Sequence, residues 1–135
     1  TVYLDSSVLL RVVFNEPDPI EEFSNISHAV SSELIRIECL RTTDRLRLKN
    51  GLSEDEYVRR VDIVHKFLKH IELVRLSAEI LNRASQPFPT ALGTLDAIHL
   101  STCLLYKERV SEVPLYTHDE GLKKAASALG LEVHG

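Results

Sequence analysis

The chain has 135 residues, of which 44% are hydrophobic, and its formal net charge is −4 at pH 7. This length and composition suit one domain over residues 1–135 that buries a sizeable core. No stretch approaches the roughly 20 apolar residues of a membrane span, and the amino end does not resemble a signal peptide. We therefore expect a soluble cytoplasmic protein that has no membrane partner. The two cysteines, Cys39 and Cys103, lack metal-ligand spacing and are interpreted as reduced core residues.

Strand and helix patterns alternate along the chain, which indicates an α/β fold. The strands are predicted at 2–4, 28–31, 71–75, 114–117 and 131–133. The helices are predicted at 7–14, 18–25, 32–49, 53–69, 77–85, 94–108 and 120–129. Alternation of this kind favours a central parallel sheet between two helical layers, which is a three-layer α/β/α domain. A helical hairpin is expected where Gly51 ends one helix and Ser53 with Glu56 forms a capping box for the next.

Asp5 follows the first predicted strand and precedes the first predicted helix. In parallel α/β sheets, ligands bind at the carboxyl ends of the strands, so a carboxylate at this boundary has access to a site. Aspartate is also a preferred residue at the N-cap of a helix. The sequence around Asp5 therefore leaves two interpretations open, a functional carboxylate and a helix cap.

Glu38 lies in the third predicted helix, beside its buried stripe rather than opposite it. An ion pair with Arg41, three residues further on, is the alternative to a functional role. Ser31 or Ser32 is the expected cap of this helix. Glu33 is interpreted as an ordinary acid of the first helical turn, which the helix dipole favours.

Asp96 belongs to the first turn of a predicted helix that is apolar on nearly every side, and this pattern implies burial. Thr94 is its expected cap. A carboxylate gains only roughly 0.3–1 kcal/mol from the helix dipole at exposed sites, which is too little to offset the burial of an unpaired charge. His99 lies on the same face, and a satisfied core histidine or one that supports the site is favoured over a metal ligand.

Asp119 repeats the arrangement of Asp5, because a short predicted strand ends, an acid appears and a helix begins. Both carboxylates would project from the same edge of a parallel sheet. If Asp5, Glu38, Asp96 and Asp119 converge, their combined charge requires a cation. Hard divalent ions such as Mg²⁺ or Mn²⁺ prefer oxygen ligands, and they can activate water for phosphodiester cleavage.

Four segments of the chain resemble the acidic motifs of the PIN domain family. In order, they are LDSSVLL, SSELIRIECLR, TLDAIHLSTCLL and LYTHDEGLKKAA. The closer resemblance is to the VapC-type ribonuclease toxins of toxin–antitoxin systems, and it covers essentially the whole chain. The acidic positions of the family fall on Asp5, Glu38, Asp96 and Asp119, and its accompanying hydroxyl falls on Thr117.

The resemblance implies a single PIN-like domain that is a Mg²⁺- or Mn²⁺-dependent endoribonuclease, the toxin of a type II system. The four acids would hold the metal, and Asp96 or Glu38 would orient the attacking water. Ser6 and Thr117 would orient the carboxylates by hydrogen bonds, with His99 beside them. The resemblance also implies an antitoxin that inserts a basic side chain among the acids and contacts the helical hairpin, and a toxin homodimer.

Two other classes of protein are compatible with parts of the sequence. A phosphatase of the haloacid-dehalogenase type also starts with an aspartate after a strand, but it needs a second aspartate where this chain has Ser7. The non-enzymatic alternative is a PIN-like binding module whose acids are caps and ion pairs, and which acts in a complex that represses transcription. Titration with Mn²⁺ separates this module from the nuclease.

The net negative charge does not by itself favour a nucleic-acid partner, since phosphate binding uses a basic surface. Basic residues are nevertheless concentrated in the third and last predicted helices: Arg36, Arg41, Arg45, Arg47, Lys49, Lys123 and Lys124. They contact a phosphate backbone or an acidic partner, or they form a solvated helix face. RNA as the substrate follows from the family resemblance alone.

Overall fold

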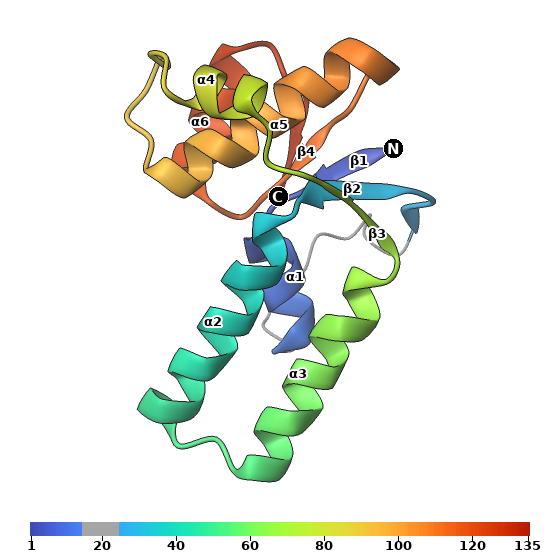
Figure 1. Cartoon of the computed structure of the whole chain (residues 1–135), viewed down its shortest axis with the longest axis vertical. Coiled ribbons are helices and arrows are strands. Elements are labelled where there is room, and N and C mark those ends of the chain that lie inside the picture. The colour runs from blue at the N-terminus through green and yellow to red at the C-terminus, as the bar shows by residue number, and fades with distance from the viewer. Residues whose placement is uncertain (15–24) are drawn as a thin grey trace.

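A central parallel sheet organises the protein, whose computed structural model describes residues 1–14 and 25–135. The strand order is β3-β2-β1-β4-β5. The strands are β1 (Val2–Leu4), β2 (Ala29–Ser32), β3 (Ile71–Val74), β4 (Leu115–Tyr116) and β5 (Val133–His134). Figure 1 shows β1 in the middle of the molecule, where it pairs with β2 on one side and β4 on the other. Because all pairings among the described strands are parallel, their carboxyl ends meet at one edge.

Helices cover both faces of this sheet. Those of the described residues are α1 (Ser6–Val13), α2 (Leu34–Asn50), α3 (Glu54–Leu68), α4 (Ala78–Ala84), α5 (Thr94–Val110) and α6 (Glu120–Ala128). Successive strand residues point to opposite faces, so Leu4 joins one core with α1, α2 and α3. Its neighbour Tyr3 joins the other core with α5 and α6, and α4 packs on α5. The predicted three-layer α/β/α architecture is confirmed.

The element boundaries agree with the sequence-based prediction to within two residues, the largest offset being that of α2, predicted from 32 and observed from Leu34. The helix predicted at 18–25 lies outside the described residues, apart from its last position. No helix in the described part of the chain combines the length and apolarity needed to cross a membrane.

The two cysteines are buried on opposite sides of the sheet. Cys39 packs in the core with α1 and α3, whereas Cys103 packs in the core with α6. Both thiols are free. The prediction that they are reduced core residues is confirmed.

The starts of α5 and α2 differ from the prediction. α5 begins at Thr94 itself, so this residue is not its cap. α2 begins after Glu33, which occupies the N-cap position rather than the first turn, and its carboxylate accepts a hydrogen bond at 2.6 Å from the backbone just beyond β3. Of the two serines expected as caps, Ser32 accepts a hydrogen bond from the Leu34 N–H at 3.2 Å, whereas Ser31 donates to a carbonyl of β1 at 2.6 Å.

α2 and α3 form the predicted hairpin, which projects away from the sheet (Figure 1). Gly51 joins them in a left-handed conformation with φ of 63°, which glycine adopts without strain. Ser53 caps α3 by accepting a hydrogen bond from the Glu56 N–H. Ile37 and Val58 are each 58% exposed on this hairpin. The hairpin therefore carries apolar surface that the described chain does not cover.

Candidate active site

The four predicted acids come together at the edge formed by the carboxyl ends of the strands. Asp5 follows β1 directly, and Asp119 follows two residues after its neighbour β4. Glu38 lies in the second turn of α2, which follows β2, and Asp96 lies in the first turn of α5. The charges of the other three acids all raise the pKa of Asp96. The structure therefore places the four carboxylates in one electrostatic environment.

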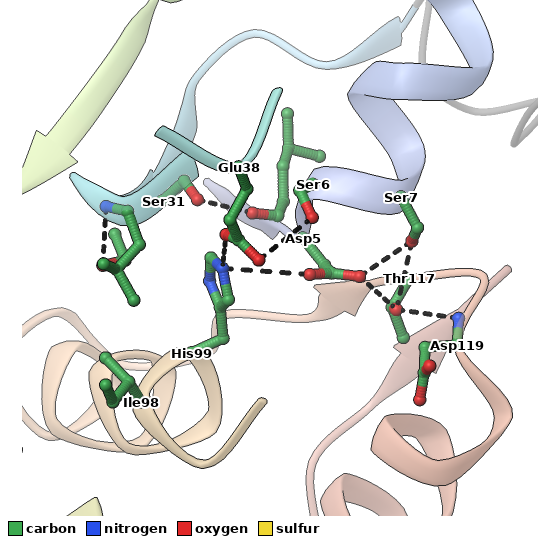
Figure 2. A network of polar contacts seen from close by, with 12 residues as sticks. Asp5, Ser6, Ser7, Ser31, Glu38, Ile98, His99, Thr117 and Asp119 are labelled. Atoms are coloured by element: carbon green, nitrogen blue, oxygen red, sulfur yellow. Dashed lines mark hydrogen bonds and ion pairs between the residues drawn. The ribbon is translucent and has the colours of Figure 1, made fainter. Parts of the chain in front are cut away.

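Asp5 is 3% exposed and is held by two hydroxyl groups. Ser7 Oγ and Thr117 Oγ1 both donate to its Oδ2, each at 2.8 Å (Figure 2). The backbone N–H groups of His118 and Asp119 donate in turn to the Ser7 and Thr117 oxygens, at 2.9 and 3.0 Å. Hydrogen bonds to a carboxylate are stronger than neutral ones and fix its orientation. This network anchors Asp5 between β1 and β4.

The serine that holds Asp5 is Ser7, which sequence reasoning did not assign to the site. Ser6 was expected to support the carboxylates, and its Oγ approaches Glu38 Oε2 at 3.4 Å, which is a long hydrogen bond. Neighbouring residues of a helix point about 100° apart, so only one of the two serines faces Asp5. Thr117 lies where the prediction required it.

Glu38 contacts a histidine rather than the arginine that was the alternative partner. Arg41 donates to Asp44 at 3.1 Å. His99 Nε2 instead contacts Glu38 Oε1 (Figure 2) and lies 3.9 Å from Asp5 Oδ1. Burial alone lowers the pKa of His99, but the hydrogen bond and charge of Glu38, followed by the charges of nearby aspartates, raise it above its ordinary value.

Asp96 and Asp119 form the more open part of the site. Burial raises the pKa of Asp96 to about 6, and the charges of Asp119 and Asp5 raise it further than burial alone. Hydrogen bonds from the described residues do not contribute to this pKa. Asp119 is exposed, and its Oδ1 caps α6 by accepting from the Leu122 N–H at 2.7 Å. The cap interpretation therefore holds for one oxygen of Asp119.

The donor chemistry of this site fits a hard divalent cation. All four acids offer oxygen ligands of the kind that Mg²⁺ and Mn²⁺ prefer. As the side chains stand, no three acidic, histidine or cysteine residues of the described chain lie close enough together to hold one ion. The repulsion that raises the pKa of Asp96 opposes a closer approach of the carboxylates. A bound cation would relieve this repulsion.

The basic residues of α2 are partly neutralised by neighbours on the same helix. Arg41 and Arg47 both form ion pairs with Asp44, at 3.1 and 2.9 Å. Arg45 donates to the Thr42 hydroxyl at 3.1 Å. These contacts suit a solvated helix face, and contact between this face and a phosphate backbone stays a prediction.

Comparison with known proteins assigns the fold and the site to a family. Residues 2–128 match the family model of the PIN domain. The chain belongs to the PIN domain family.

Two curated relatives are ribonucleases of Mycobacterium tuberculosis. The chain is 34% identical to ribonuclease VapC46 (strain ATCC 25618 / H37Rv) over 135 residues, which cover 98% of this chain and 95% of the relative. It is 23% identical to ribonuclease VapC47 (strain CDC 1551 / Oshkosh) over 124 residues, which cover 87% and 85% of the two chains. Within its family, the protein is therefore a relative of the VapC ribonucleases.

A solved structure, a toxin–antitoxin complex from Klebsiella pneumoniae, has the same fold. The TM-score is 0.66, and the match covers 96% of this chain and 93% of the other. At 13% identity, this likeness supports the fold alone.

Proposed function

We propose that the protein is a Mg²⁺- or Mn²⁺-dependent endoribonuclease and the toxin of a type II toxin–antitoxin system. The observation that carries the proposal is the coupling of four carboxylates from separate elements at one edge of the sheet. RNA as the substrate is supported by the names of the relatives, which are ribonucleases. Hydrolysis of the phosphodiester bond would leave a 5′-phosphate and a 3′-hydroxyl.

The four acids divide the proposed work. Asp5, Glu38, Asp96 and Asp119 would hold the metal. When bound, a divalent cation makes a water molecule easier to deprotonate and compensates negative charge on the phosphate. Asp5 is already oriented by its two hydroxyl donors, and Glu38 is engaged by a histidine. Asp96 has neither restraint, so we assign to it the orientation of the attacking water.

The first test is the substitution Asp96→Asn, which keeps the shape of the side chain and removes its charge. We expect cleavage of RNA in Mn²⁺ to fall by at least about 100-fold, more than the loss typical of residues that only support a ligand. Circular dichroism should show an intact fold. Glu33→Gln is the matched control, because Glu33 binds a backbone N–H away from the acids. Undiminished cleavage by Asp96→Asn would overturn the assignment.

Titration with metal separates the nuclease from the non-catalytic binding module. That alternative draws support from Asp119, which does cap a helix. The nuclease requires a stoichiometric Mn²⁺ site in calorimetry, and it requires that a chelator abolish cleavage. Ca²⁺, with longer bonds and looser geometry, should bind without supporting cleavage well. Caps and ion pairs alone would give no stoichiometric site.

We also propose an antitoxin partner and a toxin homodimer, as the relatives and the solved toxin–antitoxin complex support for such proteins. An arginine or lysine of the antitoxin would enter the acid cluster, because a desolvated acidic pocket binds a cation strongly. Its apolar residues would cover the hairpin of α2 and α3, where Ile37 and Val58 are exposed.

Charge capture by the antitoxin is tested by neutralising three acids together, in the variant Asp5→Asn/Asp96→Asn/Asp119→Asn. Antitoxin binding should weaken, and excess Mg²⁺ should compete with the antitoxin for the parent protein. Equal affinity of the variant and the parent at several salt concentrations would contradict charge capture and leave only steric cover.

A further inference from the structure

His99 joins the acid cluster to the backbone in the middle of the sheet. Its Nε2 contacts Glu38 Oε1, and its Nδ1 lies 2.7 Å from the Tyr3 hydroxyl. Tyr3 belongs to β1, and its Oη accepts a hydrogen bond at 3.0 Å from the Ser32 N–H of β2. Tyr3 and His99 are both completely buried, and their rings meet edge to face. These contacts form a continuous chain from β2 to Glu38.

The directions of the hydrogen bonds follow from the first member of this chain. A backbone N–H can only donate, so Tyr3 Oη is the acceptor for Ser32. Burial raises the pKa of Tyr3, so the hydroxyl keeps its proton and can donate it to Nδ1 of the neutral imidazole. The ring proton of His99 then lies on Nε2, which donates to Glu38. A charged imidazolium also carries a proton on Nε2, so donation to Glu38 does not depend on the charge of His99.

We propose that Tyr3 and His99 are positioning residues that hold Glu38 by one carboxylate oxygen and leave the other for a divalent cation. This inference rests on the proposed metal-dependent function and specifies how the fold prepares one of its acids. Both ring nitrogens of His99 are engaged by protein groups, so the ring has no nitrogen left to bind a metal itself. A hydrogen bond to a ligating carboxylate fixes its orientation and raises the affinity of the site.

The test compares two substitutions of His99 by their effect on Mn²⁺ affinity in calorimetry. His99→Leu removes the donor to Glu38, and it should weaken Mn²⁺ binding by about 10-fold to 100-fold. His99→Gln offers an amide N–H in place of Nε2 and should recover most of the affinity. Cys103→Ala, one turn further along α5 in the same core, controls for a general loss of packing. Parent-like affinity of His99→Leu would overturn the proposal.

A second arm asks whether the effect of His99 passes through Glu38. In the Glu38→Gln background, His99→Leu should cause little further loss of Mn²⁺ affinity, because the residue it positions has already been altered. A full additional loss would contradict the proposed path. A parent protein that bound no Mn²⁺ at all would instead defeat the metal-dependent function itself.

Imidazole ¹⁵N spectra test the geometry without metal or activity. The parent should show His99 with a proton on Nε2, and Tyr3→Phe should remove from Nδ1 the signature of an accepted hydrogen bond. A neutral His99 that carried its proton on Nδ1 would overturn the relay, whatever the result of the Mn²⁺ titrations.

Discussion

The acidic site has an anchored side and an open side. Asp5 is almost completely buried, and two hydroxyl groups donate to one of its oxygens. Asp96 is half-buried, and burial together with the neighbouring acids raises its pKa to about 6. The same residue type is thus stabilised by its partners on one side and destabilised by its neighbours on the other. The four acids are therefore not equivalent, and each side of the site can be disturbed separately.

The largest effect on stability is expected on the anchored side. The double variant Ser7→Ala/Thr117→Val leaves the buried carboxylate of Asp5 without its two hydroxyl donors. Hydrogen bonds to charged groups are strong, so we expect the free energy of unfolding at pH 7 to fall by about 3 kcal/mol in urea titrations. Ser6→Ala is the control, because its hydrogen bond at 3.4 Å is long. An equal loss in the control would erase the distinction between the two serines.

On the open side, removal of a charge should stabilise the metal-free protein. The pKa of Asp96 is about 6 in the folded state against an ordinary value of 3.8, so its ionisation reduces stability as the pH rises through 6. Asp96→Asn should therefore raise the free energy of unfolding at pH 7.5 by about 1 kcal/mol, after allowance for solvent screening of a half-buried group. The gain should vanish below about pH 4, where the carboxyl is protonated in both states.

The control for this pH dependence is Glu79→Gln. Glu79 is also an acid in the first turn of a helix, but it is exposed and forms an ion pair with Arg109 at 3.6 Å. Its removal should give no stabilisation that grows with pH. Urea titrations of both variants at pH 4, 6 and 7.5 in a chelator would decide the matter, and a gain for Asp96→Asn that was the same at every pH would contradict the repulsion.

The smallest effect is expected from Gly121→Ala, which touches the open side without removing a charge. A Cβ at this position would lie 3.3 Å from Asp119 Oδ1, so the carboxylate must shift by a few tenths of an ångström. Mn²⁺ affinity should fall a few-fold at most, while stability should not fall, because alanine favours a helix over glycine by about 1 kcal/mol. Ser127→Ala, on the exposed surface of the same helix, should leave Mn²⁺ affinity unchanged.

The fold and the meeting of the acids could be predicted because they depend on local patterns. Asp5 and Asp119 each follow a short apolar strand, and parallel strands bring such positions to one edge of the sheet. Periodicity likewise located the described helices to within two residues. These features need only the order of elements along the chain.

The contacts that orient the acids could not be predicted in the same way. The choice between Ser6 and Ser7 depends on the rotation of α1 about its axis, which a one-residue error in the start of a helix changes by about 100°. The role of Tyr3 depends on a partner 96 positions away, His99, and on the backbone of β2. The interpretation of Glu33 as a first-turn acid was wrong, because a tertiary hydrogen bond from the segment after β3 determines its place.

The central position of β1 also determines when the site can form during translation. Asp5 is synthesised early, but Thr117, one of the two hydroxyl donors that hold it, follows 112 positions later. Until β4 has left the ribosome, one edge of β1 has no partner strand and Asp5 has no support from that side. A chain whose synthesis stops before β4 therefore lacks an assembled acidic site. For a protein proposed to cleave RNA, this delay would keep unfinished chains harmless to the ribosomes that make them.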